Sequence, residues 1–64
     1  MKKYKEFPYV TKSTSGGYYY GIVYTPEEND LFFKTEMHRT QYDAYVELAN
    51  KIDEFYEKSE LHRR

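Results

Sequence analysis

The chain has 64 residues, a net charge of −1 and no cysteine. This length holds one small domain, and the lack of cysteine excludes disulfides, thiolate metal sites and a cysteine nucleophile, so a cytoplasmic protein is expected. No apolar run is long enough to span a bilayer and no signal peptide is recognised, so no membrane partner is expected. The near-neutral charge lacks the basic excess that is typical of nucleic-acid-binding proteins.

The first expected element is a strand at about residues 4–12, where aromatic and β-branched residues mix with charged ones. It contains Pro8, which has no N–H to donate to a neighbouring strand. We therefore expect this strand at an edge of the sheet. The Ser- and Gly-rich residues 13–17 that follow predict a turn and hence a hairpin.

Residues 18–24 form the predicted central strand. Side chains alternate between two sets, which are Tyr18, Tyr20, Ile22 and Tyr24 on one face and Tyr19, Gly21 and Val23 on the other. Both sets are largely apolar, which is typical of a central strand.

A solvated acidic turn is predicted at residues 25–30, with Asn29 or Asp30 in left-handed backbone, and a third strand at about residues 31–37. An amphipathic helix at about residues 41–58 is the clearest element, because Thr40 suits an N-cap and apolar residues recur at three- and four-residue steps. Its apolar stripe comprises Tyr42, Tyr45, Leu48, Ala49, Ile52, Phe55 and Tyr56. Residues 59–64 are taken as a tail whose order stays open.

These elements predict a single α+β domain over residues 1–64, a three-stranded antiparallel β-meander with one C-terminal amphipathic α-helix packed on one face (β-β-β-α). The side chains assigned to the helix-covered face are Tyr18, Tyr20, Ile22, Leu31, Phe33 and Met37. The other face has nothing to cover it and is expected to be a contact surface. The predicted partner-binding residues on that face are Tyr19, Gly21, Val23, Phe32 and Lys34.

Two family resemblances accompany this pattern. The run Gly17-Tyr18-Tyr19-Tyr20-Gly21-Ile22, followed by a turn, a strand and Thr40-Gln41-Tyr42-Asp43-Ala44, resembles the arm-type DNA-binding domain of tyrosine recombinases. That family lays a three-stranded sheet in the major groove, so the resemblance implies a DNA-binding sheet. In this chain Gly21 stands where an outward basic residue is expected, and Phe32 and Glu36 stand in a strand that the family fills with Lys and Arg. The same junction is also similar to HicB-type antitoxins, whose Pro-Asp-Leu-Pro segment is absent here.

Catalytic chemistry is not expected. The two histidines, His38 and His62, come without a Ser-rich or Gly-rich nucleophile turn. Glu36 and His38 could point the same way from an extended segment, but two ligands do not make a metal site. The chain is therefore expected to be non-enzymatic and to use neither a metal nor a cofactor.

Two binding functions remain. In the first, the open sheet face or an unpaired sheet edge docks a protein partner or a second copy of the chain, which would suit a phage or mobile-element accessory or inhibitor protein. In the second, the three-stranded sheet binds DNA or RNA. The residues expected on phosphates in that case are Lys5, Lys12, Lys34 and Arg39. Protein docking ranks first, because Glu6 and Glu36 are expected among these cations and weaken their field.

Overall fold

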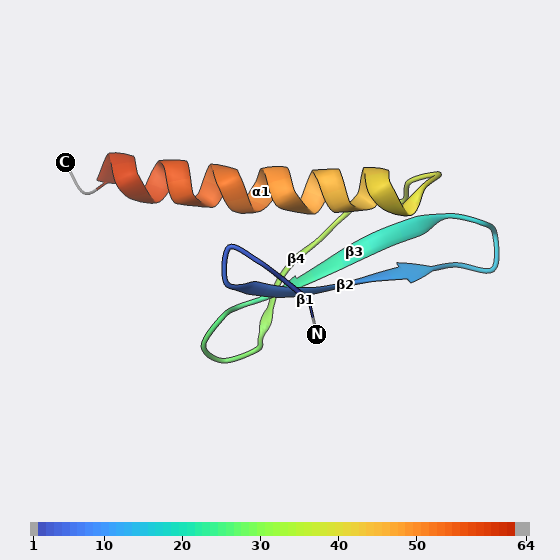
Figure 1. Cartoon of the computed structure of the whole chain (residues 1–64), viewed down its shortest axis with the longest axis horizontal. Helices are drawn as coiled ribbons and strands as arrows, with labels where there is room; N and C mark the ends of the chain where they lie inside the picture. The colour runs from blue at the N-terminus through green and yellow to red at the C-terminus, as the bar shows by residue number, and fades with distance from the viewer. Residues whose placement is uncertain (1, 63–64) are drawn as a thin grey trace.

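The computed structural model describes residues 2–62, with side chains to residue 58, as an antiparallel sheet beneath one long helix (Figure 1). In chain order the elements are β1 (Lys2–Tyr4), β2 (Phe7–Ser13), β3 (Tyr19–Tyr24), β4 (Leu31–Lys34) and α1 (Gln41–His62). The strands are neighbours in the order β1-β2-β3-β4. The predicted α+β class, with an antiparallel sheet and a C-terminal helix, is confirmed, but the sheet has four strands and not three.

The additional strand arises because the predicted strand at residues 4–12 folds back on itself. A two-residue turn at Lys5 and Glu6 joins β1 to β2, and both residues have left-handed backbone, with φ of 45° and 75°. Such turns match the twist of the two strands, but Asn and Gly are their usual residues. The helix supports this turn, since the Tyr56 hydroxyl donates to the Lys5 carbonyl at 2.7 Å. The turn therefore depends on a contact between distant parts of the chain.

Pro8 does not place its strand at the edge of the sheet, so that prediction is wrong. β2 lies between β1 and β3. The Thr14 N–H donates to the Tyr18 carbonyl at 2.8 Å. In an antiparallel pair, every second residue directs its N–H and C=O groups toward the same neighbouring strand, so the even-numbered residues of β2 direct theirs toward β3. Pro8 belongs to that even-numbered series, and the pairing of β2 with β3 begins only at Tyr9. The missing N–H shortens this ladder, while the other side of β2 stays free to pair with β1.

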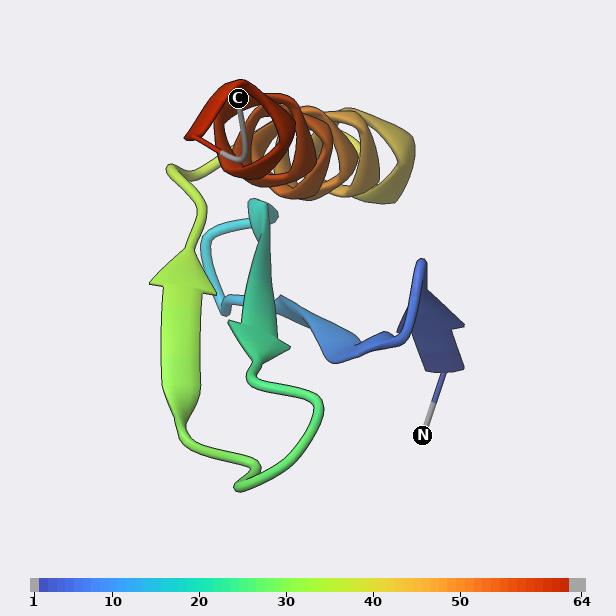
Figure 2. The same ribbon diagram turned by 90° about the vertical axis from the view of Figure 1, so that its left-hand side faces the viewer.

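The helix covers the face of the sheet that carries the odd-numbered side chains of β3 (Figure 2). Val23 is 0% exposed and forms the buried core with Phe7, Leu48 and Ile52. Aromatic rings surround this core, and the ring of Phe32 packs at a tilt against that of Phe7 with the centroids 4.9 Å apart. A few large rings thus do most of the packing in a domain this small.

Gly21 lets the helix approach the sheet closely. A Cβ at this position would lie 2.5 Å from Leu48 Cδ2 and 3.5 Å from Thr35 Cγ2. Carbon atoms pack at about 3.5–4.0 Å, so a side chain here would force the helix or Leu48 to move. The Gly21 N–H donates to the Thr35 hydroxyl at 2.8 Å, and the Thr35 N–H donates back to the Gly21 carbonyl at 2.9 Å. Gly21 is a packing point under the helix.

The predicted assignment of the two sheet faces is therefore reversed. Successive side chains of a strand point to opposite faces, so Tyr20 and Ile22 point away from the helix that covers Gly21 and Val23. Leu31 and Met37, which were expected under the helix, are 64% and 55% exposed. Phe33 does pack against the core as predicted.

The predicted turn and helix cap are confirmed. Asn29 has left-handed backbone with φ of 57°. The Asp43 N–H donates to the Thr40 hydroxyl at 3.1 Å, which satisfies one of the free donors at the helix start. The helix continues to His62, beyond the expected end at residue 58, and residues 63–64 lie outside the described part of the chain.

The buried stripe of α1 is narrower than the sequence predicts. Leu48, Ala49 and Ile52 are buried as expected, whereas Tyr42 is 71% exposed and Phe55 lies at the rim of the core. Ala44, which the predicted stripe leaves out, is fully buried. No helix among residues 2–62 combines the length and the apolar character that a membrane crossing requires.

Candidate functional site

The side of the sheet away from α1 is covered by no other element of residues 2–62 (Figures 1 and 2). We call this side the open face. Alternation and strand pairing assign its members, since Lys3 pairs with Pro8, Val10 with Ile22, Lys12 with Tyr20 and Ile22 with Lys34. The exposed or half-exposed residues of the open face are Lys3, Val10, Lys12, Tyr20, Ile22, Tyr24 and Lys34, whereas Pro8 on the same side is buried.

Charge is separated between the two layers of the fold. The strands contain four lysines and no carboxylate, and the lysines are Lys2, Lys3, Lys12 and Lys34. The helix carries five carboxylates and two lysines among its described side chains. Glu6 lies in the turn between β1 and β2, and Glu36 follows β4, so neither stands within a strand. A chain with a net charge of −1 thus presents a positive sheet and a negative helix.

The three lysines of the open face have no carboxylate partner among the described side chains, where the ion pairs are Lys5 with Asp53 and His38 with Glu47. Lys34 instead places its ammonium 5.1 Å from the centre of the Tyr20 ring. Such a cation–π contact orients the lysine without neutralising it. The open face is therefore a half-exposed aromatic and aliphatic strip flanked by free positive charges.

Most of the predicted partner-binding residues lie elsewhere. Gly21 and Val23 are buried under the helix, and Tyr19 shares their side of β3. Phe32 packs between Phe7 and the helix, 5.4 Å from the Phe55 ring centre. Their predicted exposure on the open face is wrong, because the sequence offers two apolar sets on β3 and the helix takes the smaller one. Of the five predicted residues, Lys34 is the one that the structure places on the open face.

The predicted phosphate contacts are only partly brought together. Lys12 and Lys34 lie on the open face, but Lys5 turns toward the helix and binds Asp53 at 2.7 Å. Arg39 sits before the helix, with its guanidinium 5.7 Å from the Tyr18 ring centre. Lys3 was missed, and finding it requires recognising the turn that creates β1.

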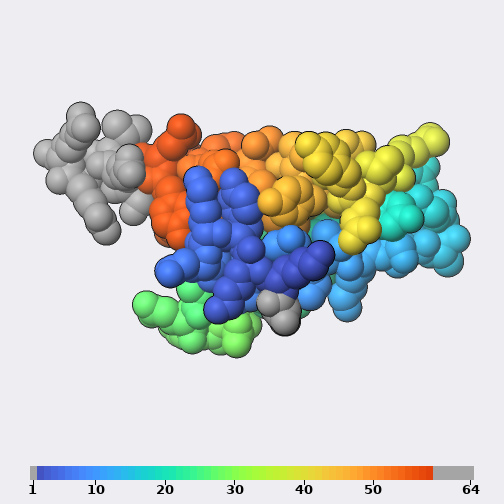
Figure 3. All heavy atoms as spheres, viewed as in Figure 1, coloured from blue at the N-terminus to red at the C-terminus, as the bar shows by residue number. Residues whose placement is uncertain are grey.

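The β1–β2 hairpin is fastened to the middle of the helix (Figure 3). The hydrogen bond from the Lys5 ammonium lowers the pKa of Asp53 below its ordinary 3.8, and the same bond raises the pKa of Lys5. The Tyr4 hydroxyl donates to both carboxylate oxygens of Asp53 at 3.2 Å. Desolvation and this bond raise the pKa of Tyr4. These contacts hold Lys3, which lies in the same hairpin, on the opposite side of the sheet.

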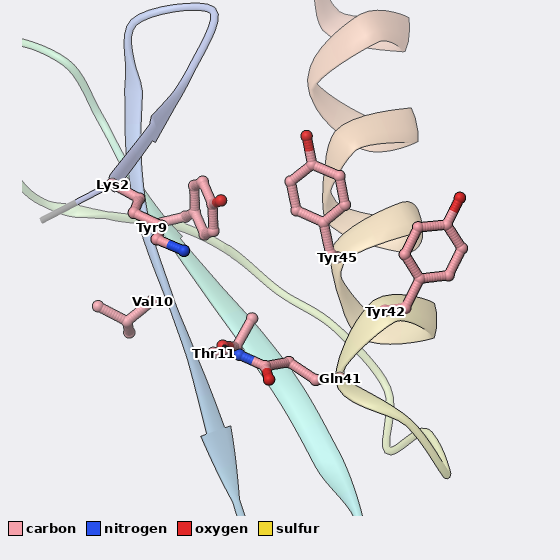
Figure 4. Close-up of a pocket in the computed structure, with 7 residues that line it drawn as sticks. All are labelled: Lys2, Tyr9, Val10, Thr11, Gln41, Tyr42 and Tyr45. Atoms are coloured by element: carbon pink, nitrogen blue, oxygen red, sulfur yellow. Dashed lines mark hydrogen bonds between the residues drawn. The ribbon is translucent and has the colours of Figure 1, made fainter.

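A groove of about 590 Å³ runs between the outer edge of β2 and the start of α1 (Figure 4). Its lining residues are Lys2, Tyr9, Val10, Thr11, Gln41, Tyr42 and Tyr45. Tyr9 points from β2 toward the helix and Val10 points away from it. The Gln41 side-chain amide donates to the Thr11 hydroxyl at 2.6 Å, which ties the helix to the strand along the groove. The groove is aromatic and contains one positive charge and no carboxylate.

The outer main-chain edge of β2 is unpaired beside this groove. β1 pairs with β2 only from Phe7 to Tyr9, whereas β3 pairs with it as far as Ser13. Even-numbered residues of β2 direct their main chain toward β3, so the N–H and C=O groups of Thr11 and Ser13 point to the outer edge. These groups have no strand partner among residues 2–62.

No constellation for catalysis or metal binding assembles among the described residues. His38 Nε2 lies 2.6 Å from Glu47 Oε1, and the main chain of His38 pairs with Tyr19 through two hydrogen bonds of 2.7 Å. These contacts join the segment after β4 to the sheet and the helix. Among the side chains of residues 2–58, which the structure describes, no group of three or more His, Asp or Glu is placed to hold a metal ion.

Comparisons with protein-family models, with curated proteins and with solved structures find no match for this chain. They therefore add nothing to the two resemblances that the sequence suggested, and the functional conclusions below depend on the residues of the chain itself.

Proposed function

We propose that the chain is a non-enzymatic nucleic-acid-binding module that contacts its ligand through the open face of the sheet. The observation that carries this proposal is the separation of charge, with unpaired lysines on the strands and carboxylates on the helix behind them. Phosphates supply most of the affinity in protein–nucleic acid contacts, and they bind where lysines are not neutralised. The overall charge of the chain hides this local excess.

Lys3, Lys12 and Lys34 come from three different strands and lie on one side of the sheet. Lysine binds phosphate as a flexible point charge and does not read base edges bidentately as arginine does. Contacts of this kind position a nucleic acid without specifying its sequence. Little sequence preference is therefore expected.

The acidic loop between β3 and β4 limits where a nucleic acid can lie. Glu27, Glu28 and Asp30 stand together at one end of the sheet, while the loop between β2 and β3 at the other end has no charged residue. Glu36 is a carboxylate near the second end, next to the bridge between Tyr19 and His38, so a polyanion is repelled more strongly from the first end than from the second. The expected path crosses the strands near Lys12 and Lys34 and has Lys3 on the side nearest the acidic loop.

Salt dependence tests the proposal quantitatively. Three lysine–phosphate contacts correspond to a slope of log K against log salt of about −2 for a single strand and about −3 for duplex DNA. Binding of labelled oligothymidylate and of a short mixed-sequence duplex is measured by fluorescence anisotropy over a range of salt concentrations. The simultaneous changes Lys3→Gln, Lys12→Gln and Lys34→Gln are expected to abolish the slope.

Lys58→Gln is the matched control for the single variant Lys34→Gln, because each removes one exposed lysine and Lys58→Gln leaves the open face intact. The control variant should bind as the wild type does. Equal losses of affinity in the Lys34→Gln and Lys58→Gln variants would show that binding depends on general charge. If neither oligonucleotide binds at low salt, the nucleic-acid proposal fails and the open face reverts to the hypothesis of protein docking.

A further inference from the structure

The outer edge of β2 and the groove beside it form a second surface, which shares Val10 and Lys12 with the open face. Main-chain donors and acceptors of Thr11 and Ser13 point outward there, and β1 ends its pairing at Tyr9. An exposed strand edge of this kind can pair with an extended chain, with side-chain pockets beside it providing selectivity. The adjoining groove supplies such a pocket from Tyr9, Tyr42 and Tyr45 (Figure 4).

The aromatic wall of the groove is available for contact. Tyr42 lies in the first turn of the helix and is 71% exposed. Its ring takes part in none of the aromatic pairs found among the described residues. Tyr45 is more restrained, because its ring lies 5.7 Å from the Tyr9 ring centre and 6.0 Å from that of Tyr4. The groove thus has one fixed wall of packed rings and one free ring at its mouth.

A second copy of the chain does not fit this edge well. Two-fold pairing of two β2 edges centred on Lys12 would set Lys12 directly opposite its own copy, and like charges in that position are destabilising. If the pairing were centred on Thr11, Ser13 of the copy would lie opposite Tyr9. That position is already occupied by Lys2 of β1 in the same chain. The positive edge instead matches a partner that carries a carboxylate.

We propose that the free edge of β2 binds an acidic extended peptide, which adds to the sheet as a short antiparallel strand in line with β1. Main-chain hydrogen bonds to Thr11 and Ser13 hold the peptide, and a carboxylate opposite Lys12 sets its register. The peptide residues on either side of that carboxylate face the helix, because side chains alternate along a strand. An aromatic residue there lies against the tyrosines of the groove.

The test uses the blocked peptide Ac-Thr-Tyr-Glu-Tyr-NH2, whose Glu pairs with Lys12 and whose tyrosines pair with Thr11 and Ser13. The full ¹⁵N-labelled chain is titrated with it and the backbone amide signals are followed by NMR. Saturable shifts and slowed hydrogen exchange are expected at the amides of Thr11 and Ser13. The same peptide with both tyrosines N-methylated keeps every side chain but loses the two donors, and it should bind far more weakly.

Variants of the protein provide the reciprocal control. Ser13→Pro removes an outward N–H at an exposed strand end, and losing one such hydrogen bond should weaken the peptide by about 2- to 10-fold. Ser13→Ala keeps the N–H and should bind normally. The proposal is overturned if the N-methylated peptide binds equally well, or if the Thr11 and Ser13 amides do not respond to the unmodified peptide. Oligothymidylate that shifts these two amides in place of the peptide would also overturn it, by making the edge part of the nucleic-acid surface.

Discussion

Substituting Gly21 by alanine tests the packing of the helix on the sheet. The added Cβ would lie 2.5 Å from Leu48 Cδ2, about 1 Å inside normal carbon contact. Leu48 is fully buried and cannot swing into solvent. Overpacking of this kind costs about 1–3 kcal/mol, while replacing glycine by alanine restricts the unfolded chain and returns about 0.4–1 kcal/mol. The net expectation is a loss of about 1–2 kcal/mol in the free energy of unfolding.

The sign of this effect should depend on residue 48. Leu48→Ala alone removes buried methyl groups and is expected to cost about 2–5 kcal/mol. In the Leu48→Ala background the Cβ at residue 21 meets no leucine methyl, so Gly21→Ala should become neutral or stabilising. The two sites are in contact, and contacting residues couple by about 0.5–3 kcal/mol in a double-mutant cycle.

Urea unfolding of the four proteins, followed by helical circular dichroism, measures both effects. Gly16→Ala is the matched control, because a Cβ there has its nearest neighbour at 3.6 Å and enters without a clash. The close approach of Leu48 to β3 would be refuted if Gly21→Ala were as stable as Gly16→Ala and changed the free energy of unfolding equally in the wild-type and Leu48→Ala backgrounds.

Two further changes address the helix cap and the hairpin. Thr40→Ala removes the acceptor of the Asp43 N–H and should lower the free energy of unfolding by about 1 kcal/mol, measured by urea unfolding; an unchanged midpoint would contradict the cap. The pKa of Asp53 is lowered by its hydrogen bonds from Lys5 and Tyr4, so its stabilisation is present above its ordinary value of 3.8 and is lost as the pH falls through the lowered pKa. Asp53→Asn should therefore lower the melting temperature at neutral pH and lose this difference in acid, whereas a difference that persists in acid would point to packing.

The helix, its cap and the acidic turn could be predicted because local sequence determines them. Thr40 is a good N-cap wherever a helix follows, and Asn29 tolerates left-handed backbone in any context. The turn at Lys5 and Glu6 could not be predicted in the same way, because neither residue favours positive φ. Its support comes from Tyr56, which lies 51 positions away from Lys5 in the sequence.

The face of β3 that meets the helix also could not be decided from alternation. Both sets of side chains are apolar, and the set with larger rings was assigned to the core. The structure shows the opposite, because Gly21 has no side chain and leaves room for Leu48. Gly21, which was predicted to bind a partner, instead accommodates the chain's own helix.

The reversal of the two faces also explains which residues of the open face could be predicted from the sequence and which could not. Lys12 and Lys34 were identified as cations of the sheet, and the structure places both on the open face. Tyr20 and Ile22 were assigned to the core and instead form the strip between these lysines. The separation of lysines and carboxylates depends on which residues lie in strands, and the bounds of the strands come from the structure.

The two isoleucines of the chain give the most direct test of the proposed nucleic-acid surface. Ile22 lies on the open face between Val10 and Lys34, whereas Ile52 is a residue of α1 whose side chain is fully buried in the core between helix and sheet. Methyl groups of both are observed by NMR in ¹³C-methyl-labelled protein during titration with oligothymidylate and with a short duplex. We expect the Ile22 methyl signals to shift saturably and those of Ile52 to stay in place. Binding that leaves Ile22 unmoved would contradict the assignment of the open face as the nucleic-acid surface.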